Sequence, residues 1–322
     1  MASDPRTRVT ARAPAQGGFF ARLADEPALL MVLTGLFWAG NAIVARSIAG
    51  EVPPIGLAFW RWAVAALVVL PFAWPHVRRD AKAMLADWPT MLLLSALGIS
   101  FFNAGLYLAA QSTTALNIVM LQSAVPVLIV VASFILFRDA VTPRQACGIA
   151  ISLTGALTLI SHGDIGVLTH FELNSGDLWM LAAGVSYAVY TAMLRKRPAV
   201  HGLSFLFATF AIGAALLLPF YVAESLHARP MPLNWHAFLA VGYVAVFASV
   251  VAYFCFNRTV ELLGANAAGL TVHLVPLFGT LLAVALLGES LHLYHALGIG
   301  LIAAGILLAT RSTVVAKKRI TT

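Results

Sequence analysis

The chain has 322 residues, of which 61% are hydrophobic and only 10% charged, and its mean hydropathy is +0.89. A soluble protein carries about 25% charged residues, so this chain lacks the polar surface that a water-soluble fold requires. Its partner is therefore expected to be the lipid bilayer. The net charge of +7 is interpreted as a sign of membrane topology rather than of nucleic-acid binding.

Ten stretches are long and apolar enough for spanning helices, which need about 20 residues each. In chain order they cover residues 28–48, 55–74, 89–110, 113–137, 143–160, 176–194, 202–223, 236–257, 264–287 and 294–310. Helices are expected because backbone polar groups in hydrocarbon must be satisfied within the segment, and the alternation typical of a transmembrane β-barrel is absent. The predicted fold class is an all-α integral membrane protein.

The basic residues are divided unequally between the two sides of the predicted membrane. The basic tails at 1–27 and 311–322, together with the connections after the second, fourth, sixth and eighth spans, hold 17 of the 20 lysines and arginines. The other connections hold only Arg229. Because positively charged connections stay in the cytoplasm, both termini are predicted to be cytoplasmic.

The two halves of the chain, 28–160 and 176–310, resemble each other at a fixed offset. The matched pairs, each 150 residues apart, are Ala115 and Ala265, Pro126 and Pro276, Asp139 and Glu289, Gly148 and Gly298, and Gly155 and Gly305. Each half holds five spans, so the second half is predicted to enter the membrane from the opposite side. Such inverted-topology repeats form many secondary transporters, which alternate access to a central cavity.

Two short runs strengthen this interpretation: Phe-Trp-Ala-Gly-Asn at 37–41 and Phe-Trp-Arg at 59–61. With the repeated proline, acidic residue and glycine pair, the chain resembles the drug/metabolite transporter superfamily in its ten-helix EamA-type form. Its layout is most similar to the bacterial amino-acid exporters of the YddG type. The resemblance implies a secondary transporter of the bacterial inner membrane that exports amino acids, including aromatic or apolar ones, and related metabolites. A broad metabolite or drug exporter and a channel-like facilitator are the alternatives.

Polar and aromatic side chains within apolar spans normally face a cavity or one another. The predicted substrate-binding residues are Trp38, Asn41, Arg61, Asn103, Tyr107, Gln122, Tyr187, Tyr190, Tyr253, Asn257 and His273. For each residue singly, the alternative is that it joins neighbouring helices by hydrogen bonds. As a set, with Trp38 far from either membrane interface, they favour a lined cavity.

Two of these residues carry specific hypotheses. Arg61 could bind a substrate carboxylate bidentately. Its depth of only about 9 Å at 1.5 Å per residue instead favours snorkelling to the outer interface, or hydrogen bonds to the carbonyl groups of a broken helix end. His273 is expected to be a neutral hydrogen-bonding residue of the cavity rather than a titrating one, because burial opposes its charged form.

Pro126 and Pro276 each remove a backbone hydrogen bond in mid-span, and their repetition predicts paired hinges. Gly148, Gly155, Gly298 and Gly305 should let the fifth and tenth spans approach closely. These spans are expected at the periphery, and a homodimer contact there stays open.

Several activities have no support in the sequence. Paired midplane carboxylates, a zinc-binding His-Glu-x-x-His run and a nucleotide-binding loop are all absent, so neither an enzyme nor a cofactor or metal site is expected. Cys147 and Cys255 lie in apolar runs, which argues against a disulfide framework. Because no acidic residue lies near the middle of a span, proton antiport and facilitated diffusion both stay open.

Overall fold

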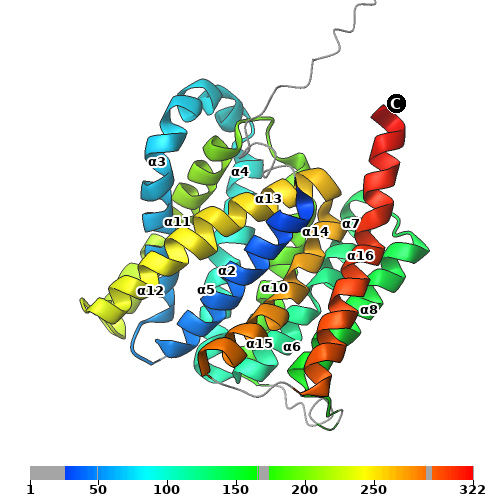
Figure 1. Cartoon of the computed structure of the whole chain (residues 1–322). Helices are drawn as coiled ribbons and strands as arrows, with labels where there is room; N and C mark the ends of the chain where they lie inside the picture. The colour runs from blue at the N-terminus through cyan, green and yellow to red at the C-terminus, as the bar shows by residue number, and fades with distance from the viewer. Residues whose placement is uncertain (1–25, 49, 165, 167–173, 288–291, 322) are drawn as a thin grey trace, which may run out of the picture.

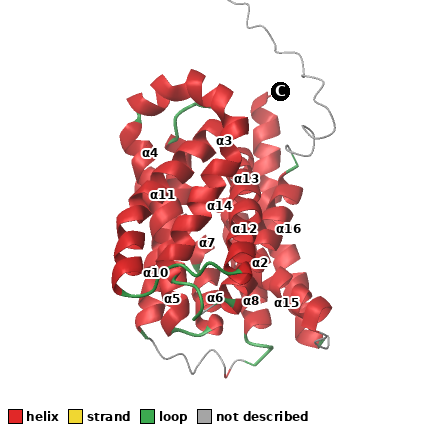
Figure 2. Cartoon of the chain, turned by 90° about the vertical axis from the view of Figure 1, so that its left-hand side faces the viewer, coloured by secondary structure: helices red, strands yellow, loops and turns green. Residues whose placement is uncertain are grey.

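The computed structural model describes residues 26–48, 50–164, 166, 174–287 and 292–321. All regular elements in these ranges are helices, arranged side by side as a bundle (Figures 1 and 2). Residues 1–25 of the predicted N-terminal tail and Glu289 lie outside the described residues.

The first half of the chain forms eight helical elements. They are α2 (Pro27–Ser47), α3 (Pro54–Ala86), α4 (Trp88–Leu94), the π-helix η1 (Ser95–Phe101), α5 (Phe102–Ser112), α6 (Ala115–Ser123), α7 (Val125–Phe137) and α8 (Pro143–Ile160). Helix α3 continues 12 residues beyond the predicted end of the second span at 74. The third span runs through α4, η1 and α5, and the fourth is divided into α6 and α7.

The second half has a similar order. Its elements are α10 (Ser175–Met193), the 3₁₀ turn η2 (Leu194–Lys196), α11 (Gly202–His227), α12 (Trp235–Ala245), the π-helix η3 (Val246–Val251), α13 (Ala252–Leu263), α14 (Ala265–Gly269), the 3₁₀ turn η4 (Leu270–His273), α15 (Leu274–Leu287) and α16 (Leu293–Thr321). The backbone of α16 continues through most of the predicted C-terminal basic tail.

Within the described residues, nine helices are long and apolar enough to cross a membrane. The fifth predicted span is also a helix, α8, but Arg144 and Gln145 in its first turn make it less apolar than the others. The protein is therefore a multi-pass membrane protein. The exact number of ten spans and the opposite insertion of the two halves stay predictions.

Large apolar side chains cover the outside of the bundle. Phe72, Phe134, Phe220 and Phe238, from four different helices, are each about half exposed or more. Soluble monomers rarely expose such extensive apolar surface. These side chains are placed to contact lipid tails.

Helices α8 and α16 pair closely at one side of the bundle (Figure 1). A methyl group added to Gly155 would lie 2.7 Å from the Gly298 carbonyl oxygen, and one added to Gly305 would lie 2.5 Å from that of Gly148. The four glycines thus let two backbones touch, as the sequence predicted. The glycine-lined faces of α8 and α16 therefore contact each other within one chain.

Candidate functional site

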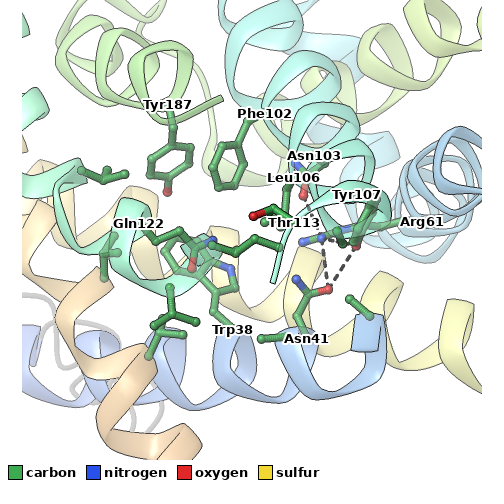
Figure 3. A pocket seen from close by; sticks show the side chains of 18 of the residues that line it. Trp38, Asn41, Arg61, Phe102, Asn103, Leu106, Tyr107, Thr113, Gln122 and Tyr187 are labelled. Atoms are coloured by element: carbon green, nitrogen blue, oxygen red, sulfur yellow. Dashed lines mark hydrogen bonds between the residues drawn. The ribbon is translucent and has the colours of Figure 1, made fainter. Parts of the chain in front are cut away.

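A cavity of about 100 Å³ opens between α2, α3, α5, α6, α10 and α13 (Figure 3). Eight of the predicted residues surround it: Trp38, Asn41, Arg61, Asn103, Tyr107, Gln122, Tyr187 and Tyr253. They come from both halves of the chain. The rest of the lining is largely apolar and includes Phe102, Leu106, Ile118 and Val275, which no polar pattern in the sequence marks as cavity residues.

The Arg61 side chain is buried in this cavity, and the residue is only 1% exposed. Its Nη1 group donates to Asn103 Oδ1 at 2.8 Å, to the Tyr107 hydroxyl at 2.9 Å and to Asn41 Oδ1 at 3.4 Å. Its Nε group donates to Ser249 Oγ at 2.6 Å. Arg61 therefore does not snorkel to the outer interface, because the neighbouring helices supply acceptors that hold it inside.

The acceptors around Arg61 are neutral. Nη2 donates to the Ala248 carbonyl oxygen at 2.8 Å, and the guanidinium carbon lies 4.7 Å from the centre of the Trp62 ring. Among the described residues, no carboxylate forms an ion pair with Arg61. Arginine keeps its charge in proteins, and each Nη group has two N–H donors. The cavity wall thus carries an uncompensated positive charge with donor capacity remaining at Nη2.

The two π-helices supply carbonyl groups to this region. The Ala248 carbonyl in η3 accepts from Trp38 Nε1 at 3.2 Å as well as from Arg61. The Gly98 carbonyl in η1 accepts from the Tyr253 hydroxyl at 2.8 Å. Each π-helix therefore binds side chains of the opposite half of the chain. Short π-helical segments are frequent at functional sites, but neither apolar run shows a sequence signal for one.

Aromatic rings form the inner wall of the cavity. Trp38 meets Tyr187 and Tyr253 edge to face, with ring centres 5.8 and 5.9 Å apart, and its ring lies 5.3 Å from that of Phe256. The Tyr187 hydroxyl is buried and has no hydrogen-bond partner within the described structure. A buried hydroxyl normally has a partner, so this group marks a position where a ligand atom could bind.

Three predicted lining residues lie elsewhere. Tyr190 packs behind Tyr187, with ring centres 5.5 Å apart, and donates to Asn257 Oδ1 at 3.0 Å. Asn257 lines a different cavity, which lies where α10 and α13 end. The spacing that places Tyr187, Tyr190 and Asn257 on inward faces is consistent with both locations, because a helical stripe does not specify depth along the bundle.

His273 is also absent from the cavity wall. It is fully buried between the two halves, where its Nδ1 atom contacts the Ser152 hydroxyl and its Nε2 atom lies 3.0 Å from the Ser123 carbonyl oxygen. A neutral ring satisfies both contacts by accepting at Nδ1 and donating at Nε2. A neutral, hydrogen-bonded histidine agrees with this geometry, and His273 is not among the residues that line the cavity.

The two predicted hinges coincide with helix breaks. Span 4 is interrupted at Ala124, two residues before Pro126. Span 9 changes to the 3₁₀ turn η4 over Leu270–His273, shortly before Pro276. His273 joins these two breaks through the Ser123 carbonyl. Bending at either site stays a prediction.

The second cavity, termed the polar vestibule below, has a volume of about 340 Å³. It lies where α7, α10 and α13 end and α14 begins. Arg195 pairs there with Asp139, and Arg197 pairs with Glu261. No sequence pattern marks this site, because each of these charges lies at a helix end, where solvent contact alone would explain it.

A buried acid near the cavity was also missed. Asp177 is fully buried, and its Oδ1 atom accepts from Thr113 Oγ1, a cavity residue, at 2.6 Å. Asn117 and the Asn174 backbone donate to its Oδ2 atom at 3.2 and 2.9 Å. Asp177 and Asn174 form a capping box at the start of α10, so the carboxylate is held by helix-capping contacts. No cluster of metal-ligating side chains occurs among the described residues.

Comparisons with known proteins identify the relationship of the chain. An uncharacterized transporter of Archaeoglobus fulgidus is 30% identical over 88% of this chain and 96% of its own length. The uncharacterized transporter YyaM of Bacillus subtilis is 25% identical over 88% of this chain and 92% of its own length. A solved crystal structure with 20% sequence identity shares the fold with a TM-score of 0.71, covering 92% of this chain and 99% of the other.

The profile of the EamA-like transporter family matches the chain twice, at residues 26–161 and 174–311. These two matches cover most of the chain, and the matched relatives are themselves named as transporters rather than enzymes. The chain therefore belongs to the EamA-like transporter family, within the drug/metabolite transporter superfamily, and is not an enzyme.

Proposed function

We propose that this transporter exports apolar and aromatic amino acids, together with related small carboxylate metabolites, across the bacterial inner membrane by alternating access. The observation that supports this proposal is the buried, uncompensated charge of Arg61 in the central cavity. Its substrate would be bound by its carboxylate. This assignment agrees with the predicted resemblance to amino-acid exporters of the YddG type.

A carboxylate suits Arg61 for geometric and electrostatic reasons. Burying a charge is costly unless the charge is paired, and the described neighbours of Arg61 offer only neutral oxygens. A guanidinium N–H donates a strong, charge-assisted hydrogen bond to a carboxylate, and Arg61 has such a donor remaining at Nη2. A substrate carboxylate would therefore supply the counter-charge that the protein leaves out.

The rest of the wall suits an apolar amino acid. Trp38, Phe102 and Tyr187 present rings to the cavity, and an apolar side chain gains free energy by leaving water. The same rings attract a cation over their faces, which provides a place for the substrate ammonium. Gln122 adds an amide at the cavity wall.

The proposal is tested by uptake into proteoliposomes containing the purified protein. The labelled panel comprises leucine, phenylalanine, a nucleobase and a cationic drug, with and without a pH gradient. We expect saturable movement of the two amino acids. Replacing Arg61 by Gln removes the charge but keeps an amide, and should weaken apparent affinity about 10- to 100-fold, since a hydrogen bond to a charged group contributes about 1.5–3 kcal/mol.

Arg78→Gln is the matched control, because Arg78 is an exposed cation on the same helix. It should transport as the wild type does. Movement of only the drug or the nucleobase would favour the broader exporter, and saturation-free movement would favour a facilitator. Unchanged amino-acid affinity in Arg61→Gln would refute the assignment of Arg61. Comparison of inside-out and right-side-out vesicles tests the direction of export.

A further inference from the structure

We infer that the polar vestibule is a second binding site, which receives the amino acid as a zwitterion at the end of the bundle opposite the Arg61 cavity. This inference rests on the proposed function for the identity of its ligand. Its own basis is a different cavity with a different chemistry. The vestibule is larger than the central cavity, at about 340 Å³ against about 100 Å³.

The charges of the vestibule are balanced. Arg195 and Arg197 contribute two positive charges, and Asp139 and Glu261 contribute two negative ones. All four side chains are partly solvent-exposed, from 19% for Arg197 to 48% for Arg195. A wall with both signs complements a ligand that carries a carboxylate and an ammonium a few ångströms apart. A net anion or a net cation would meet repulsion from half of these groups.

An unpartnered amide lies at the deep end of the vestibule. Asn257 is only 5% exposed, and its Nδ2 group has no hydrogen-bond partner within the described structure. Its Oδ1 atom is already bound by the Tyr190 hydroxyl, which leaves Nδ2 as the group available to a ligand. A buried N–H group without an acceptor is costly, and a carboxylate oxygen of the ligand would satisfy it.

The position of Asn257 also separates the two sites. The hydrogen bond between Tyr190 and Asn257 lies on the vestibule side of Tyr187, whose ring lines the central cavity. Val260 and Leu194 provide apolar contacts in the vestibule for the side chain of the amino acid. The ligand would therefore bind with its carboxylate toward Asn257 and Arg197 and its ammonium toward Glu261 or Asp139.

The test measures protection of an introduced thiol in the purified, detergent-solubilised protein. Ala199 is an exposed residue of the vestibule wall, and Ala199→Cys is made after Cys147 and Cys255 are replaced by Ser. A charged methanethiosulfonate reagent labels the thiol with and without ligand. Ala86→Cys, at an exposed position where α3 ends, provides the control outside the vestibule.

Three ligands with the same isobutyl side chain distinguish the charge classes: leucine, 4-methylpentanoate without the ammonium, and 3-methylbutylamine without the carboxylate. We expect leucine to slow labelling of Ala199→Cys but not of Ala86→Cys, with each analogue at least tenfold weaker. Asn257→Ala should weaken the protection about tenfold, because it removes the donor to the carboxylate. Equal protection by an analogue, or none by leucine, would overturn the inference.

Arg61→Gln separates this inference from the proposed function. A vestibule that binds leucine by itself keeps its protection in Arg61→Gln, although transport is weakened. If protection disappears with Arg61, the labelling reports only a movement driven from the central cavity and the vestibule site is refuted. If leucine is transported in an Arg61-dependent manner without protecting the thiol, the inference fails alone. If leucine is neither transported nor protective, both proposals fail.

Discussion

A methyl group added to Gly305 should separate α8 from α16 and destabilise the protein. The added Cβ atom would lie 2.5 Å from both the Gly148 carbonyl oxygen and the Ser152 backbone nitrogen. Neither atom belongs to a side chain that can rotate away. Ordinary van der Waals contact begins near 3.4 Å, so the two backbones must move apart by about 0.9 Å.

The size of the effect follows from two opposing terms. Overpacking of a close contact costs about 1–3 kcal/mol, whereas Gly→Ala in a helix gains about 1 kcal/mol from helix propensity. We expect Gly305→Ala to lower the free energy of unfolding by up to about 2 kcal/mol, the difference between these two terms. The control is Gly300→Ala on the same helix, where an added Cβ atom meets nothing within 4 Å, and this change should be neutral or stabilising.

The assay is equilibrium unfolding in mixed micelles of dodecyl maltoside and SDS, followed by circular dichroism and tryptophan fluorescence. Wild type, Gly305→Ala and Gly300→Ala are compared at equal protein concentration. The close backbone contact would be refuted if Gly305→Ala unfolded at the same SDS fraction as Gly300→Ala. A further variant, Gly155→Ala, examines the other end of the contact, where the added Cβ atom would lie 2.7 Å from the Gly298 carbonyl oxygen.

Two further predictions concern the ends of α11. The Glu224 carboxylate accepts from the backbone N–H groups of Ile55 and Gly56 at 3.2 and 2.7 Å, at the start of α3, where a negative charge is favoured. Glu224→Gln should therefore lower the free energy of unfolding by about 1 kcal/mol in the same assay. An unchanged unfolding midpoint would contradict this role of Glu224. Partial burial and the stacked ring of His76 lower the pKa of His201 below its usual 6.5. The unfolded chain therefore binds a proton at His201 more readily than the folded chain does. The contribution of His201 to the free energy of unfolding should be complete above about pH 6.5 and should decline as the pH falls below that value. His201→Asn, which keeps a helix-capping side chain, should flatten that decline, whereas His236→Asn at an exposed site should not.

Much of the architecture could be predicted because it depends on local sequence properties. Apolar length predicts the spanning helices, and a proline without its N–H predicts a break near Pro126 and Pro276. The glycine spacing of α8 and α16 predicts close helix approach, because only glycine leaves room for two touching backbones. It does not predict that each of these helices is the other's partner. Each of these properties acts over one or two helical turns.

The parts that could not be predicted depend on distant groups. Arg61 is held inside by Ser249 and the Ala248 carbonyl, both almost 190 residues away in the sequence, so counting its depth along one helix gave the wrong environment. His273 faces inward as predicted, but a contact with Ser152 places it between the halves rather than in the cavity. The π-helices leave no mark in an apolar run, because any apolar residue fits an α-helix or a π-helix equally well.

The Ala248 carbonyl of η3 accepts from Trp38 on α2 and from Arg61 on α3 at the same time. One oxygen atom is therefore a shared attachment point for two helices of the first half on one helix of the second. A ligand that draws the Arg61 guanidinium toward itself leaves this oxygen to the indole alone. Occupancy of the cavity is in this way linked to the orientation of Trp38, so indole fluorescence should report ligand binding before any movement of the bundle.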